Sequence, residues 1–434
     1  MRPVKIDYYQ HRRRFQDQLR PNSVAIFIAP PASIRSHDVE FPYRTSSDIY
    51  YLTGFEEPHC ALVLTADQAI IYLRERDVQS EQWTGYRLGV RRARQQLQFD
   101  ESRNINVFFK ELAGLLQDKE VLYYKAGVYT AADQRVFATL HQVRQSSRNG
   151  DFAPEVIINP DTILHEMRLL KNTAEIEAMQ NSASITGLAH ENILQNSKVG
   201  MYAWEVEAWI KYTFRQHNAL EAYPSIVAPG KEACILHYIE NKVKLKAGDL
   251  VLVDAGAEFQ YYAADVTRTW PVSNRFTPAQ RDLYQIVLQA QKEAIRSCVK
   301  GSSLQIVHQA ALQVLIDGLK SLKLLQGSME SILADESYKK YYMHKTSHFL
   351  GMDVHDVGNY FDKQKKPRPL RNGMVITVEP GLYIPPSDRL APREMRGCGI
   401  RIEDDILIQN ARPRNLTDFI PKEIAEIEAL RSAG

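Results

Sequence analysis

The chain lacks the features that mark disulfide-rich, membrane-spanning and nucleic-acid-binding proteins. Its 434 residues include only four cysteines, and none of them has C-x-x-C spacing. No apolar signal region follows Met1, and no run of about 18 apolar residues occurs anywhere in the sequence. The net charge is only +2, which gives no basic surface for nucleic acid or an anionic membrane. We therefore expect a cytoplasmic protein with reduced thiols and with no nucleic-acid or membrane partner.

Common hydrolytic and nucleotide-binding motifs are also absent. The sequence contains no serine-hydrolase elbow, no H-E-x-x-H and no complete P-loop. Cys398 lies shortly before an acidic residue, Glu403, but we interpret it as a buried inert thiol. Any hydrolytic chemistry must therefore come from another set of residues.

Apolar patterning divides the chain into two predicted domains, 1–170 and 171–434. The first alternates strand patterns with amphipathic helical patterns, which predicts an α/β domain. Its predicted strands are 24–28, 49–52, 61–64, 69–73 and 121–124. The run of three arginines at 12–14 is predicted to be the solvated face of an N-terminal helix.

The second domain contains two stretches that resemble each other. Gly248, Asp254 and Gly256 each lie 125 residues before their counterparts, which are Gly373, Glu379 and Gly381. Between the copies, Thr277-Pro278 predicts a helix start, and a second helix is expected from about Ser303. A constant offset is typical of internal duplication, so we predict a duplicated α+β unit.

Each copy leads to a second acid, which is Asp265 in the first and Glu403 in the second. A hairpin with a two-residue loop at 259–260 would place Asp254 opposite Asp265, with Cβ atoms about 5 Å apart. Two carboxylates at that distance repel by roughly 3 to 4 kcal/mol at an effective dielectric near 20. Salt-bridged structural acids are one interpretation, and bound divalent cations are the one we favour.

Three histidines, His344, His348 and His355, fall within twelve residues just before the second copy. Four carboxylates and one imidazole form a hard, oxygen-rich ligand set. Such a set suits Mn²⁺, Co²⁺, Fe²⁺ or Zn²⁺ in a two-metal hydrolytic site, and it argues against a structural zinc.

Several motifs together resemble one family. They are residues 235–238, 253–256, 264–269, 347–358, 378–383 and 399–404, with 41–58 in the first domain. The chain resembles the pita-bread metallopeptidases and, within them, the bacterial Xaa-Pro aminopeptidases known as aminopeptidase P. This resemblance implies an N-terminal α/β aminopeptidase P domain and a pseudo-two-fold α+β pita-bread catalytic domain.

The resemblance also implies metal ligands. Asp265, His348, Glu379 and Glu403 would hold one ion, and Asp254 would hold the other with bridging Asp265 and Glu403. Mn²⁺ is the expected ion, with Co²⁺, Fe²⁺ or Zn²⁺ as alternatives. A hydroxide would bridge the two ions and attack the peptide carbonyl, and Glu379 would carry the proton to the leaving nitrogen.

Further residues match family positions outside the ligand set. His237 and His355 would face the substrate, and Arg401 would support Asp254. For His344, a supporting role and a plain structural role both remain open. Trp83 matches a family segment that can approach a neighbouring subunit, although a lone tryptophan is more often part of a core. The loop at 362–371 is longer and more basic than the family pattern predicts.

The implied function is that of an exopeptidase which releases the first residue of peptides with proline second. A homo-oligomer, either dimer or tetramer, is expected. One alternative is a prolidase, which takes dipeptides. Another is a metal-free binding module, a class that has lost the five ligands retained here.

Overall fold

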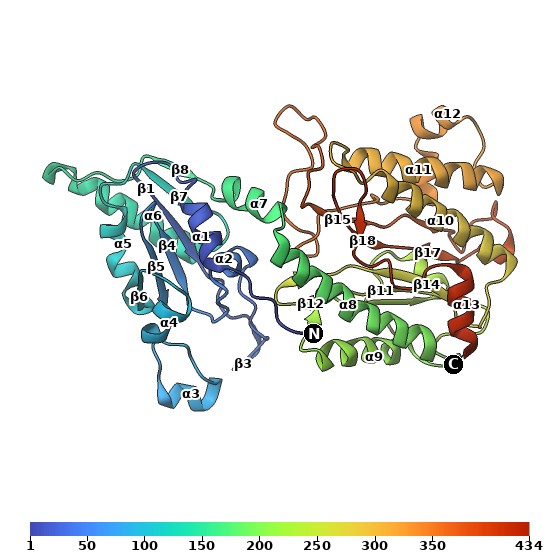
Figure 1. Ribbon diagram of the computed structural model, residues 1–434, viewed down its shortest axis with the longest axis horizontal. Coiled ribbons are helices and arrows are strands. Elements are labelled where there is room, and N and C mark those ends of the chain that lie inside the picture. Colours follow the sequence, from blue (N-terminus) through green and yellow to red (C-terminus); the bar gives the residue numbers. More distant parts are fainter. Residues whose placement is uncertain (434) are drawn as a thin grey trace. The chain divides into compact units, whose positions relative to one another are not determined.

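The computed structural model describes residues 1–433, which form two compact units (Figure 1). One unit comprises Ile6–Arg168, and the other comprises Leu169–Gly434 together with Met1–Lys5. The first residues belong with the second unit because the Val4 backbone N–H donates to Gln260 Oε1 at 2.7 Å. The domain assignment of 1–170 and 171–434 remains a prediction. Among the described helices, none is both long and apolar enough to cross a membrane.

The N-terminal unit is built on one mixed sheet of six strands in the order β6-β5-β4-β1-β7-β8. Its central strand β1 runs antiparallel to β4 and parallel to β7. The strands are β1 (Ser23–Ile28), β4 (Ala61–Leu64), β5 (Ala69–Leu73), β6 (Glu101–Asn104), β7 (Val121–Tyr124) and β8 (Val156–Ile158), with a separate hairpin of β2 (Ile34–Ser36) and β3 (Val39–Glu40). The predicted α/β class is confirmed.

Helices accompany this sheet, and α5 and α6 bury Phe108, Leu112 and Val136 in one core with the strands. The helices are α1 (Tyr8–Gln16), α2 (Ser47–Thr53), α3 (Val78–Thr84), α4 (Val90–Gln96), α5 (Phe108–Leu116), α6 (Thr130–Gln145) and α7 (Asp161–Leu169).

The strand predicted at 49–52 is wrong, because these residues lie in α2. The Ser46 side chain caps this helix by accepting a hydrogen bond from the Ile49 N–H, and Gly54 ends it with a φ of 63°. A four-residue apolar run has too few residues for periodicity to separate a strand from a buried helix. The cap and the terminal glycine decide in favour of the helix.

The prediction of a solvated arginine face is wrong for Arg12, which is buried in α1. Its guanidinium donates to the carbonyl oxygens of Leu52, Leu97 and Gln98 at 2.7 to 2.8 Å. The burial of this charge depends on carbonyl groups distant in sequence. Trp83 in α3 is 89% exposed, so of the two interpretations given for it only the contact with a neighbouring subunit stays a prediction.

The C-terminal unit places short strands between two helix pairs, α8 with α9 and α10 with α11 (Figure 1). Thr277 caps α10, which begins at Pro278, and Ser303 caps α11, as the sequence predicts. The helices are α8 (Thr173–Asn196), α9 (Ala203–Gln216), α10 (Pro278–Arg296), α11 (Leu304–Ser321), α12 (Met329–Ala334) and α13 (Ile424–Ala433).

The two sequence copies form equivalent antiparallel strand pairs, β11-β14 and β15-β18. A third strand extends each sheet, which is β10 beside β11 in the first and β19 beside β18 in the second. The turn glycines before β11 and β15, Gly248 and Gly373, have φ angles of 86° and 88°. The strands of this unit are β9 (Leu220–Glu221), β10 (Ile226–Pro229), β11 (Leu250–Asp254), β12 (Ala257–Phe259), β13 (Tyr262–Ala263), β14 (Thr267–Pro271), β15 (Val375–Val378), β16 (Gly381–Tyr383), β17 (Gly399–Arg401), β18 (Asp404–Leu407) and β19 (Arg414–Asn415). The predicted duplicated α+β unit is confirmed.

The predicted register of the first hairpin is wrong by two residues. The turn lies at Gln260 and Tyr261, whose φ angles are 52° and 66°, so Asp254 pairs with Thr267 and not with Asp265. Positive φ at both central residues is what a two-residue type I′ turn requires. A two-residue shift leaves alternate side chains on the same face, so the acids can still meet.

Gly256 allows close packing in this hairpin, because a Cβ at this position would lie 1.8 Å from the Ala264 carbonyl oxygen. We expect Gly256→Ala to separate the chain segments that carry Asp254 and Asp265. Such overpacking costs about 1 to 3 kcal/mol, so the melting temperature should fall by several degrees in a thermal-shift measurement.

The matched control is Gly114→Ala in α5, where nothing lies within 4 Å of the new methyl group. Alanine in a helix is favoured over glycine by about 1 kcal/mol, so this control should melt at or above the wild-type temperature. A Gly256→Ala variant that melts like the wild type would show that the close packing is unimportant.

Candidate metal centre

The four predicted acids lie beside the ends of paired strands in the two copies. Asp254 ends β11 and Glu379 follows β15, while Asp265 precedes β14 and Glu403 precedes β18. Val378 pairs with Asp404, and Gly381 pairs with Arg401. The two pairs have the same register, which places Glu379 opposite Glu403. The strand pairing therefore holds these two carboxylates together.

His348 joins the acids through its Nε2 atom, which lies 3.4 Å from Asp265 Oδ2 and 3.8 Å from Glu379 Oε1. Candidate ligand atoms of Asp265, His348 and Glu403 all lie within 4.8 Å of one another. The Nδ1 atom of His348 is 3.1 Å from the Phe349 carbonyl oxygen. A hydrogen bond there would place the proton on Nδ1 and leave the Nε2 lone pair for a metal ion.

Tyr223 links two of the carboxylates. Its hydroxyl lies 2.6 Å from Asp254 Oδ1 and 2.5 Å from Asp265 Oδ1. Burial and the two neighbouring carboxylates raise the pKa of Tyr223 well above its usual value. Because the tyrosine stays protonated, its hydroxyl can donate to either acid.

Arg401 connects the two sequence copies. Its Nη2 lies 2.5 Å from Asp254 Oδ2, and its Nε donates to Thr267 Oγ1 at 3.0 Å. Thr267 in turn donates to Glu403 Oε2 at 2.7 Å. Residues of each copy thus orient an acid of the other.

Burial dominates the electrostatics of the cluster. It raises the pKa of Asp254, Glu403 and Glu379, that of Glu379 to about 7. Burial alone would lower the pKa of His348, but the neighbouring Asp265 and Glu379 raise it to about 9. Four carboxylates face one guanidinium and one imidazole, so the cluster favours added positive charge. Its hard oxygen donors and single imidazole fit divalent metal ions.

Comparison with known proteins shows that nearly the whole chain is similar to metallopeptidases. The pattern of metallopeptidase family M24 matches residues 177–410, and that of the aminopeptidase P N-terminal domain matches residues 8–123. The Xaa-Pro aminopeptidase of Escherichia coli is 40% identical over 433 residues, 98% of each chain. That of Haemophilus influenzae is 41% identical over 431 residues, 98% of this chain and 97% of the relative.

The chain belongs to metallopeptidase family M24, in its aminopeptidase P branch. The solved structure of Pseudomonas aeruginosa aminopeptidase PepP superimposes with a TM-score of 0.97 at 39% identity, covering 99% of both chains. The duplicated C-terminal unit is therefore the pita-bread fold, and the M24 family relationship implies a divalent metal cofactor.

The histidines outside the proposed M24 ligand set surround this centre. The ring of His355 packs edge-on against that of His348, with centroids 4.4 Å apart. His344 Nε2 lies 2.8 Å from the Tyr383 hydroxyl. Burial is the main cause that lowers the pKa values of His344 and His355, and the nearby imidazole of His237 adds to both effects. The structure thus brings His237, His344 and His355 to one region.

Three residues of the M24 centre were missed by reasoning from the sequence, namely Tyr223, Thr267 and Tyr383. Thr267 and Tyr383 lie inside the family motifs 264–269 and 378–383, and their hydroxyl groups close in sequence to the acids could have pointed to them. No local pattern marks Tyr223, which reaches the acids through tertiary folding. Cys398, by contrast, is buried with its pKa raised to about 11, which agrees with an inert thiol.

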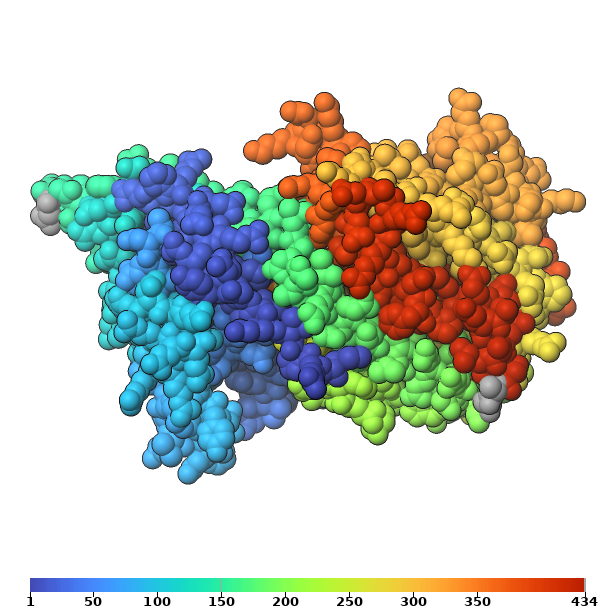
Figure 2. Space-filling model, in the orientation of Figure 1, coloured from blue at the N-terminus to red at the C-terminus, as the bar shows by residue number. Residues whose placement is uncertain are grey.

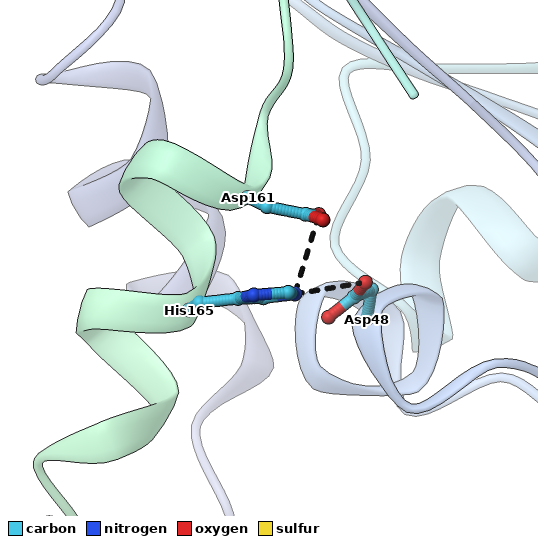
Figure 3. Close-up of side chains that lie close together, drawn as sticks. All are labelled: Asp48, Asp161 and His165. Atoms are coloured by element: carbon cyan, nitrogen blue, oxygen red, sulfur yellow. Dashed lines mark ion pairs between the residues drawn. The ribbon is translucent and has the colours of Figure 1, made fainter. Parts of the chain in front are cut away.

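A second group of residues of the types that bind metals, Asp48, Asp161 and His165, lies in the N-terminal unit (Figure 3). His165 Nε2 is 3.2 Å from Asp161 Oδ1 and 3.7 Å from Asp48 Oδ2. Here the chain supplies its own cations, because Lys125 lies 2.8 Å from Asp161 and Arg168 lies 2.6 Å from Asp48. This group is therefore an ion-pair network that connects α2 to α7.

The position of Tyr223 leads to a testable consequence for metal affinity. We expect Tyr223→Phe to weaken metal binding about tenfold, because hydrogen-bond partners that orient ligands typically contribute that much. Competition of the purified protein with a chelator of known affinity measures the change.

Tyr284→Phe is the matched control, since its buried hydroxyl donates to the Lys422 carbonyl oxygen at 2.8 Å and to no acid of the cluster. Equal metal affinity in Tyr223→Phe and Tyr284→Phe would show that Tyr223 does not orient the ligands.

Proposed function

We propose that this chain is an Xaa-Pro aminopeptidase, a metal-dependent exopeptidase that releases the first residue of peptides with proline second. The observation that carries the proposal is the cluster of Asp254, Asp265, His348, Glu379 and Glu403 in a pita-bread fold. The aminopeptidase P N-terminal domain and the full-length likeness to two Xaa-Pro aminopeptidases support the choice of substrate.

Two divalent ions, most simply Mn²⁺, are proposed to bind this cluster. Asp265, His348, Glu379 and Glu403 would hold one ion, and Asp254 would hold the other with Asp265 and Glu403 shared. The excess of buried carboxylates over cationic side chains supports two ions in preference to one. A homo-oligomer, dimer or tetramer, remains the expectation.

The ions, when bound, supply a water of lowered pKa and positive charge for the oxygen of the attacked carbonyl. Glu379 would accept a proton from the attacking water and pass it to the leaving nitrogen. Burial raises the pKa of Glu379 to about 7, which supports a role in proton transfer. Arg401 keeps Asp254 oriented through their direct contact.

His237 and His355 are proposed to face the substrate as hydrogen-bond donors. Both lie beside the cluster without belonging to the five ligands, and His355 packs directly against His348. A donor in this position would stabilise the negative charge that develops on the carbonyl oxygen. His344 would act through Tyr383, whose hydroxyl also accepts from Arg401 at 3.1 Å.

The central test is hydrolysis by metal-analysed protein. Purified chain should release the first residue from Xaa-Pro-Xaa tripeptides, lose this activity in a chelator and regain it with Mn²⁺. Asp265→Asn should lose both ions, because it removes a negative charge that both share. Asp317→Asn, on an exposed face of α11, is the control and should retain both ions.

The outcomes separate the possible functions. Full activity without bound metal would overturn the proposal. Cleavage of Xaa-Pro dipeptides without cleavage of tripeptides would assign the chain to the prolidases.

The role of His355 can be tested independently. His355→Ala should keep its metal content while kcat and kcat/KM fall together by about a hundredfold, since one such donor contributes about 3 kcal/mol in the transition state. Metal analysis and steady-state kinetics measure both quantities. His141→Ala, at an exposed position of α6, serves as the control. If His355→Ala instead loses one ion per chain, His355 is a ligand and not a donor.

A further inference from the structure

The segment that carries His237 has a regular arrangement of inward and outward side chains. Leu236 and Tyr238 pack inward against an apolar core, whereas Ile235, His237 and Ile239 all point outward. The two isoleucines are 52% and 55% exposed. The segment therefore presents one outward row in which two apolar side chains flank the histidine.

This row is fixed to the metal centre by the core beneath it. Tyr238 shares that core with Leu252 of β11, two residues before Asp254, and with Tyr383. The hydroxyl of Tyr383 contacts both His344 and Arg401. The row therefore lies beside the residues that surround the metal ligands.

The far end of the segment is also held in place. Asn241 is buried, accepts a hydrogen bond from the Val227 N–H at 2.9 Å and donates to the Ser225 carbonyl oxygen at 2.9 Å. The Lys242 N–H donates to the Tyr238 hydroxyl at 3.2 Å. A row anchored at both ends presents a defined surface to a ligand.

A hollow of about 440 Å³ runs along this row and is lined by Ile235, His237, Ile239 and Val243. Its lining also contains Glu232 and Glu240, with Lys242 Nζ 3.2 Å from Glu240 Oε2. The lining thus combines apolar side chains with two carboxylates and one ammonium group, which leaves it a net negative charge. An apolar side chain suits this hollow, and an acidic one is repelled.

The position of the hollow indicates which part of the substrate binds in it. The first residue and proline of the substrate must lie at the metal centre, where we propose that His237 faces them. The next residue is only about 3.3 Å further along an extended chain, so it is within reach of the hollow beside His237. Single exposed isoleucines need no explanation. Ile235 and Ile239, however, flank the proposed substrate-facing His237 beside a hollow, where they can contact the peptide after proline.

We propose that Ile235 and Ile239 bind the side chain of the residue that follows proline and select for an apolar residue there. The inference rests on the proposed Xaa-Pro aminopeptidase activity and adds a third position to its specificity. Such contacts release water from the exposed isoleucines and from the substrate side chain.

The test compares amidated tripeptides, so that no free carboxylate lies at the third residue. The peptides are Ala-Pro-Leu-amide, Ala-Pro-Ser-amide and Ala-Pro-Asp-amide. With metal-loaded wild type, we expect kcat/KM to be about tenfold higher for the leucine peptide than for the serine peptide, and lowest for the aspartate peptide.

Replacement of the isoleucines should remove this preference. In Ile239→Ser and Ile235→Ser, the ratio of kcat/KM for the leucine peptide over the serine peptide should fall toward one, mainly through KM. Ile306→Ser on α11 replaces an isoleucine of similar exposure, 47%, and should keep the wild-type ratio. The melting temperature of each variant establishes that it is folded.

The outcomes distinguish this inference from the function on which it rests. If the metal-loaded wild type cleaves none of the peptides, the proposed aminopeptidase activity fails. If it cleaves the leucine and serine peptides equally well, or if both isoleucine variants keep the wild-type ratio, the activity stands and the assignment of this row is overturned.

Discussion

Repulsion among four clustered carboxylates, of which Asp254, Asp265 and Glu403 are buried and Glu379 is partly buried, is the constraint on which the C-terminal unit depends. Two ionised acids about 4 to 5 Å apart repel by roughly 3 to 4 kcal/mol at an effective dielectric near 20. The chain opposes this repulsion with donors aimed at individual acids, namely Tyr223 toward Asp254 and Asp265, Thr267 toward Glu403, and Arg401 toward Asp254. These donors do not balance the charge, which explains why the centre fits divalent cations.

Duplication alone does not build this centre. Each copy brings a strand that ends beside an acid, but Arg401 of the second copy orients Asp254 of the first. Conversely, Thr267 of the first copy donates to Glu403 of the second. Each half depends on the other for the orientation of its ligands, so one copy could not form the site by itself. The short strands matter because they hold these donors in register.

The ion-pair network around Asp48 shows why residue types are insufficient to identify a metal site. Asp48, Asp161 and His165 resemble the candidate metal centre in composition and spacing. Lys125 and Arg168 contact these acids directly. Despite burial, His165 and Arg168 hold the pKa of Asp48 well below its usual range. The supply of cationic side chains, more than the presence of acids, separates a structural network from a metal centre.

Features that depend on local order could be predicted from the sequence. The constant offset between the two copies, the helix starts at Thr277 and Ser303, and most strands of the first domain follow from periodicity and capping. The family motifs pointed to the five residues that the structure brings together. Four other features could be seen only in the folded chain, namely the hairpin register, the burial of Arg12 in α1, the helical state of α2 and the contact of Tyr223 with two acids. These features depend on turn geometry or on contacts between residues far apart in the chain, whose energies no local pattern contains.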